Sequence, residues 1–181
     1  MGFWDKIEVI DRRWIYLMVA LAVILPFLVP MKFPISISPE ARSFYNAVEA
    51  LPDSCTVMLV FDYYPSTMAE TEPMAIAGAR HLFRKDCKII TLTNIPYGAP
   101  SMAEAVTRSV AQEYGKEYGK DFVNLGYKYG YTAVLKGMGM SIEDIFPTDN
   151  SGTPLSEIPM MDSIVNYNQI SFIFEVADNA T

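Results

Sequence analysis

The sequence of this chain lacks the glycine-rich loops that hold phosphate groups. Only 10 of its 181 residues are glycine, and neither G-x-G-x-x-G nor G-x-x-x-x-G-K-[ST] occurs. The stretch DYYPSTMAETE follows the apolar run CTVMLVF, where a nucleotide-binding domain would place such a loop. Its proline and tyrosines would block the close backbone approach that glycine permits. The sequence therefore favours neither a dinucleotide nor a P-loop site.

Histidine and cysteine are also scarce. The chain has one histidine, His81, and two cysteines, Cys55 and Cys87. This set excludes a site with several histidine ligands and does not match a structural zinc site. The G-x-S-x-G turn of a serine nucleophile is absent as well. We therefore predict no metal site, no cofactor and no catalytic residue.

Basic residues are in the minority beyond the first 33 residues. The formal charge of the region after Phe33 is about −8, counting Lys, Arg, Asp and Glu. A surface with this charge repels phosphate backbones and anionic lipid headgroups. Nucleic acid is therefore excluded as a predicted partner.

Hydrophobic residues make up 51% of the chain, and one long run of them lies near its start. Trp14–Met31 contains no charged residue, and a helix over 14–33 would have the length needed to cross a bilayer. We predict a transmembrane helix whose residues Trp14–Phe33 contact the lipid bilayer, preceded by an amphipathic leader at 1–13. A cleaved signal peptide is the alternative, but this leader carries Asp5, Glu8 and Asp11 and no A-x-A pattern follows the run.

Lysine and arginine on the two sides of this run predict its orientation. Lys6, Arg12 and Arg13 precede the run, whereas Lys32 and Arg42 follow it. Because basic residues close to a membrane tend to stay on its cytoplasmic side, we expect a single-pass protein of the cell membrane. Its N-terminus would be cytoplasmic and its remaining domain extracytoplasmic.

Strand and helix patterns alternate after residue 34. Apolar strand patterns occur at 55–63, 87–94, 121–127 and 170–178, and helical patterns at 39–52, 72–86, 101–120 and 131–138. A shorter helical pattern lies at 161–169. This alternation predicts an α/β fold, a three-layer doubly wound sandwich with a mainly parallel sheet, Rossmann-like or flavodoxin-like, over 34–181.

Polar residues follow the predicted strands. In parallel sheets, ligands bind beyond the carboxyl ends of the strands, where the strand order reverses. Asp62 and Asp178 could also form an acid pair there, although acids commonly end strands because loops are solvated. The candidate ligand-binding residues are Asp62, Tyr63, Ser66, Asn94, Tyr127, Lys128 and Asp178.

The two cysteines each begin a predicted strand. Because one helix separates these strands, we expect them to be adjacent and parallel, with Cys55 and Cys87 at the same level about 4.8 Å apart. That distance permits a disulfide if both side chains point to the same face. The alternative is a pair of buried free thiols, as in a cytoplasmic domain.

The repeat EYGKEYGK at 113–120 places two glycines inside a predicted helix, at a cost of about 1 kcal/mol each. Either the helix has begun to unwind there, with Gly119 as its cap, or the small residues and tyrosines form a partner surface.

Several longer stretches, among them SPEARSFYNAVEALP, VMLVFDYYPS, HLFRKDCKIITLT and FPTDNSGTPLSEIP, carry a resemblance that spans most of the chain. The chain resembles an uncharacterised group of bacterial single-pass membrane proteins with a Rossmann-like exported domain. Members of that group are longer at the C-terminus. The resemblance implies that the α/β domain is incomplete here, because the chain is truncated or because a partner completes the sheet.

Two functions are compatible with this sequence. The first is a membrane-anchored accessory or scaffold subunit of a membrane protein complex, binding other membrane subunits through its α/β domain. The alternative is a membrane-tethered small-molecule-binding protein or enzyme, with its site at the carboxyl ends of the parallel strands. The missing motifs favour the first.

Overall fold

The computed structural model describes residues 11–28 and 36–178, in two compact units, Met1–Ala41 and Arg42–Thr181. In the first unit, helix α2 spans Arg12–Leu28 and contains Pro26. Residues 1–10 of the predicted leader and residues 29–33 of the predicted transmembrane helix lie outside the described residues. None of the helices in the described part of the chain is both long enough and apolar enough to cross a membrane.

From residue 39 onward, helices alternate with strands, as the sequence predicts. The region predicted as a short helix at 161–169 forms short 3-10 turns instead. In chain order the elements are α3 (Pro39–Glu49), β1 (Thr56–Asp62), α4 (Met68–Arg84), β2 (Lys88–Thr93), α5 (Ala99–Glu113), β3 (Phe122–Tyr127), α6 (Tyr131–Met138), α7 (Ile142–Ile145), η1 (Leu155–Glu157), η2 (Pro159–Ser163), η3 (Tyr167–Gln169) and β4 (Phe172–Ala177).

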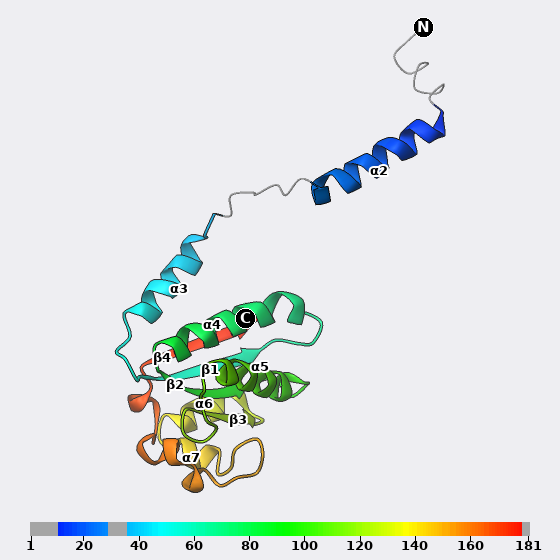
Figure 1. The fold of residues 1–181 in the computed structure, drawn as a ribbon. Helices are drawn as coiled ribbons and strands as arrows, with labels where there is room; N and C mark the ends of the chain where they lie inside the picture. The colour runs from blue at the N-terminus through cyan, green and yellow to red at the C-terminus, as the bar shows by residue number, and fades with distance from the viewer. Residues whose placement is uncertain (1–10, 29–35, 179–181) are drawn as a thin grey trace. The chain divides into compact units, whose positions relative to one another are not determined.

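The four strands form one parallel sheet in the order β3-β2-β1-β4. The chain moves from β1 outward to β2 and β3, then returns to the other side of β1 as β4 (Figure 1). The strand order therefore reverses between β1 and β4, which is the switch point of a Rossmann-like sheet. The predicted α/β class and parallel sheet are confirmed.

Strand β1 lies between two apolar clusters because its side chains alternate between the faces of the sheet. Val57, Leu59 and Phe61 pack with residues of α3, α4 and α5 in one cluster. Met58 and Val60 pack with residues of α6, α7 and the 3-10 turns in the other. Helices thus cover the sheet from both sides (Figure 1). This explains why β1 reads as a continuous apolar run rather than an alternating one.

Strand β4 is covered less completely than its neighbour. Phe174 packs beneath α4, where Gly78 leaves room for the ring: a Cβ at Gly78 would lie 2.4 Å from Cε1 of Phe174. On the opposite face, Ile173 is 51% exposed, whereas Met58 beside it on β1 is 1% exposed. In the described part of the chain, β4 pairs with β1 alone.

Helix α5 differs at both ends from its predicted bounds. It begins at Ala99 after Gly98, two residues before the predicted start at 101. It ends at Glu113, and Gly115 and Gly119 adopt positive φ angles of 63° and 77°. The helix predicted through residue 120 is therefore wrong, because the amide of Gly119 donates to the carbonyl of Phe122 at 2.8 Å instead of continuing a helix.

A disulfide joins Cys55 and Cys87 at the amino ends of β1 and β2. Their Cα atoms are 4.5 Å apart, and their sequence separation is 32. Parallel pairing in register brings them together, because Thr56 and Lys88, the next residues, are direct partners. Both cysteines are buried, so the bond lies within the first apolar cluster.

We expect no free thiol in the denatured, unreduced protein. Reduction should lower the free energy of unfolding by about 3 to 4 kcal/mol, the chain-entropy estimate for a closed loop of about 30 residues. Thiol titration in denaturant and urea unfolding with and without reductant measure both quantities. The Cys55→Ser/Cys87→Ser variant is the control, since reductant should not change its stability. Two titratable thiols in the unreduced protein would contradict the bond.

Candidate functional site

The carboxyl end of β1 is tied to β2 by the side chain of Asp62. Its Oδ1 atom accepts a hydrogen bond from the backbone amide of Asn94 at 2.7 Å, and its Oδ2 atom accepts one from Nδ2 of Asn94 at 2.6 Å. The hydroxyl of Thr93 donates to Oδ1 at 3.3 Å. Asp62 is 9% exposed, so its carboxylate is satisfied mainly by these protein donors rather than by water.

Asp178 ties the end of β4 to β1 and to the loop that follows β1. Its backbone amide donates to the carbonyl of Asp62 at 3.3 Å. Its Oδ2 atom accepts from the amide of Tyr64 at 3.3 Å and from the hydroxyl of Thr67 at 3.1 Å. These bonds tie the loop after β1 to the end of β4. They cross the switch point, the position where a ligand would bind in an open sheet.

The other predicted ligand-binding residues do not join this group. Tyr63 is completely buried in the core, where burial raises the pKa of its hydroxyl to about 12. Ser66 is exposed in the loop, and Tyr127 is half-buried at the end of β3. Lys128 donates to the carbonyl of Ile145 at the end of α7. The structure thus brings together Asp62, Asn94 and Asp178 and places the remaining four elsewhere.

Glu175 is a neighbour of Asp62 that sequence reasoning missed. It lies on β4 beside Val60, on the face of the sheet opposite α4, and it is exposed. Partial desolvation by the neighbouring residues and, after it, the charge of Asp62 raise the pKa of its carboxyl group. The sequence alone does not indicate this contact, because Glu175 and Asp62 are neighbours only through the pairing of β4 with β1.

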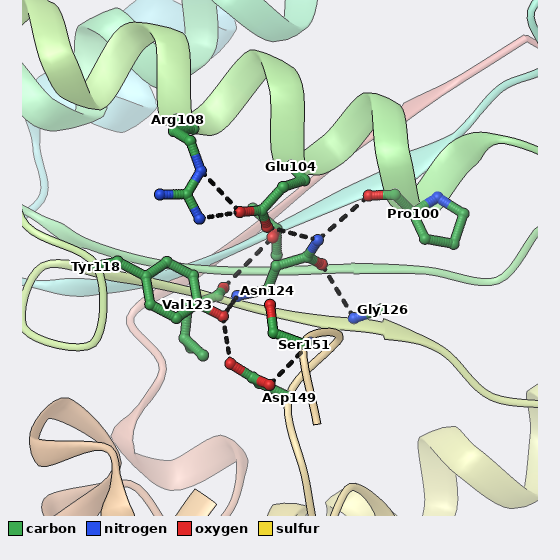
Figure 2. A network of polar contacts seen from close by, with 10 residues as sticks. Pro100, Glu104, Arg108, Tyr118, Val123, Asn124, Gly126, Asp149 and Ser151 are labelled. Atoms are coloured by element: carbon green, nitrogen blue, oxygen red, sulfur yellow. Dashed lines mark hydrogen bonds and ion pairs between the residues drawn. The ribbon is translucent and has the colours of Figure 1, made fainter. Parts of the chain in front are cut away.

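A second polar network, also missed, is centred on Asn124 in β3 (Figure 2). Asn124 is 1% exposed, and its amide group donates to Oε2 of Glu104 at 3.0 Å and to the carbonyl of Pro100 at 3.2 Å. Its Oδ1 atom accepts from the amide of Gly126 at 3.0 Å. The side-chain amide of asparagine has two N–H donors and two acceptor lone pairs, and three of these four are used here. Asn124 thereby holds α5 on β3.

The same network fixes the loop at 149–153. The hydroxyl of Tyr118 donates to Oδ2 of Asp149 at 2.6 Å, and Oδ1 of Asp149 accepts from the amide of Ser151 at 2.8 Å (Figure 2). The same Oδ1 atom accepts from the amide of Thr153 at 2.8 Å. Burial and the bond to Asp149 raise the pKa of Tyr118. Arg108 lies over the Tyr118 ring at 5.2 Å from its centroid. Each polar group here has a structural partner.

A groove of about 420 Å³ lies beside this network. Arg108 and Glu104 form an ion pair on its wall, so their charges are directed at each other. Among the described residues, no group of three or more His, Cys, Asp or Glu is placed to hold a metal ion. The groove is lined by Ser101, Glu104, Ala105, Arg108, Ser109, Gln112 and Asn150.

Comparison of this chain with protein-family models, with curated proteins and with solved structures found no match. The resemblance to the group of single-pass membrane proteins therefore stays a prediction.

The Tyr118→Phe substitution should lower the free energy of unfolding by about 1.5 to 3 kcal/mol, because it removes a partly buried hydrogen bond to a carboxylate. Urea unfolding measures the change. Tyr129→Phe is the matched control, since Tyr129 is 89% exposed and should tolerate the loss of its hydroxyl. Equal stability of the two variants would show that the Tyr118 to Asp149 bond does not hold the loop.

The Glu175→Gln substitution should raise the free energy of unfolding at pH 7 and leave it unchanged near pH 3. The raised pKa means that the folded state holds the proton more tightly than the unfolded state, so stability falls as pH rises through the carboxyl range. Glutamine removes that loss. Urea unfolding at both pH values is the measurement, with Glu157→Gln as an exposed control. Lower stability of Glu175→Gln at pH 7 would contradict this assignment.

Proposed function

We propose that this chain is a membrane-anchored accessory subunit that binds other membrane protein subunits through its α/β domain. The observation that carries the proposal is the contrast between the switch point and β4. The polar side chains at the switch point bond to protein donors, whereas β4, within the described residues, pairs with β1 alone and exposes Ile173 on one face. A strand edge with free backbone groups is a binding surface for another chain.

The helix α2 supports the anchored part of the proposal. Its residues from Trp14 to Leu28 carry no charge, and apolar side chains occur all around it rather than along one stripe. A helix of this kind is covered by lipid or by other protein, because exposing apolar side chains to water on all sides of a helix is unfavourable. Membrane proteins next to it provide such a cover.

The disulfide supports the proposed extracytoplasmic location of the α/β domain. Disulfides form and persist outside the cytoplasm, where thiols are not kept reduced. The bond between Cys55 and Cys87 joins two core strands and suits a domain that must fold in an oxidising compartment. With the basic residues Arg12 and Arg13 in the first turn of α2, before its apolar run, this arrangement agrees with a cytoplasmic N-terminus.

The alternative function, a tethered small-molecule binder or enzyme, is favoured by one observation. Asp62 and Glu175 place two carboxyl groups near each other beside the switch point, and the pKa of one is raised. Paired carboxyl groups with separated pKa values are typical of acid and base catalysis. A bound metabolite in the purified protein would support this alternative.

Mild detergent should release this chain from native membranes as part of a complex much heavier than 20.3 kDa. Size-exclusion chromatography with light scattering gives the mass of the protein part, and mass spectrometry identifies the other subunits. The same preparation after treatment with a harsh detergent is the control for subunit dissociation. A stable particle that contains one copy of the chain and no other protein would contradict the accessory-subunit proposal.

A further inference from the structure

We infer that the groove between α4 and α5 binds a small primary amine with an apolar tail, and that the ammonium group of this ligand pairs with Glu72. The walls of the groove are parts of two helices that are described from end to end, α4 and α5. No residue of β4 lines it, so the site is independent of the proposed accessory function.

The groove has the size and the lining of a small-molecule site. Its volume is about 490 Å³, and such sites typically measure about 300 to 1,000 Å³ and have mainly apolar walls with a few polar groups. Met68 and Ile76 line it from α4, and Met102 and Val106 line it from α5. Met68 is 40% exposed, so an apolar tail in the groove would remove apolar surface from water.

Glu72 determines the charge of the ligand. Among the described residues that line the groove, Glu72 alone is charged. It is half-buried, and none of the ion pairs found between described residues includes it. By contrast, Glu104 and Glu113 on α5 each pair with an arginine. A carboxylate that is partly withdrawn from water favours a cation beside it, because its own solvation is incomplete.

The hydroxyl group of Tyr63 is a second polar group at this place. Tyr63 is completely buried and packs in the first apolar cluster with Ala75 of α4 and Ala103 of α5. Its hydroxyl has no hydrogen-bond partner among the described residues. Burial and, after it, the charge of Glu72 raise the pKa of Tyr63 to about 12, so the Glu72 carboxylate lies within electrostatic reach of this hydroxyl.

A primary ammonium group matches these two polar groups better than other small ligands. It has three N–H donors, so it can pair with the carboxylate of Glu72 and donate to the hydroxyl oxygen of Tyr63. Because Tyr63 stays protonated at neutral pH, the groove carries one negative charge, which a single ammonium group neutralises. A carboxylate or phosphate ligand would be repelled by Glu72 and by the net charge of the domain.

Methionine methyl NMR of the full chain in lipid nanodiscs tests this inference. Isotope-labelled methyl groups place one reporter on each wall, Met68 and Met102, and two exposed reporters outside the groove, Met74 and Met140. Hexylamine is the probe, and hexanol and hexanoate are controls with the same tail. We expect saturable shifts of the Met68 and Met102 signals with hexylamine. Hexanol should bind roughly tenfold more weakly, and hexanoate more weakly still, since both lack the charged donor.

Substitutions of the two polar groups separate binding from structure. Glu72→Gln should weaken hexylamine binding roughly tenfold and abolish its advantage over hexanol. Glu70→Gln is the matched control, because Glu70 is an exposed acid on α4 that does not line the groove. Tyr63→Phe should weaken hexylamine binding roughly fivefold, the effect of one hydrogen bond, without lowering the stability measured by urea unfolding. The hydroxyl that it removes has no partner within the described protein.

Four results would overturn the inference. The first is equal affinity for hexylamine and hexanol, and the second is an affinity that Glu72→Gln leaves unchanged. The third is a set of shifts that grow without saturation at all four methionines, which would show partition into the lipid only. The fourth is the absence of shifts at Met68 and Met102. Unchanged affinity of Tyr63→Phe would contradict the role of its hydroxyl. The proposed accessory function is tested separately, by the mass of the extracted complex.

Discussion

The position of β1 between β2 and β4 is the constraint on which the rest of the domain depends. Its side chains enter both apolar clusters, and its backbone pairs with a strand on each side. The cysteine before β1 meets the cysteine before β2, and the aspartate that ends β1 meets Asn94 after β2. The disulfide and the polar group thus mark the two ends of one strand. A shift of register by one residue would break both and turn the apolar side chains to the wrong faces.

The hydrogen bonds at the switch point stabilise the domain, whereas the proposed binding surface lies at β4. Asp62 and Asp178 hold the strand ends and the loop at 63–67 together through donors supplied by the protein itself. Buried carboxylates need such donors, because an unpaired one is costly. Binding a ligand at the switch point would break the hydrogen bonds of the Asp62 and Asp178 carboxylates. Binding at β4 would break none of these hydrogen bonds. Glu175 is the exception in the group, since partial burial and the nearby charge of Asp62 raise the pKa of its carboxyl group.

The sequence predicts the fold class well because both periodicities are clear in it. Apolar runs indicate the four strands, and the helical pattern from residue 39 correctly indicates the start of α3. Helix α5 was extended too far because tyrosine and lysine are compatible with a helix, while the left-handed backbone at Gly115 is decided by the connection to β3. The sequence also indicates polar residues at the strand ends, among them Asp62 and Asn94. The sequence does not indicate the contacts of Glu175 or Asn124, since the residues that these two contact come from distant parts of the chain.

Amide hydrogen exchange tests most directly the claim that the β4 edge, rather than the strand ends, is the binding surface. Exchange is measured by mass spectrometry on the complex extracted in mild detergent and on the isolated chain. The account predicts that amides of Phe172–Ala177 exchange more slowly in the complex, while those of Asp62 and Asn94 exchange at the same rate in both. Equal exchange of β4 in the two samples, with slowing at the strand ends in the complex, would contradict it.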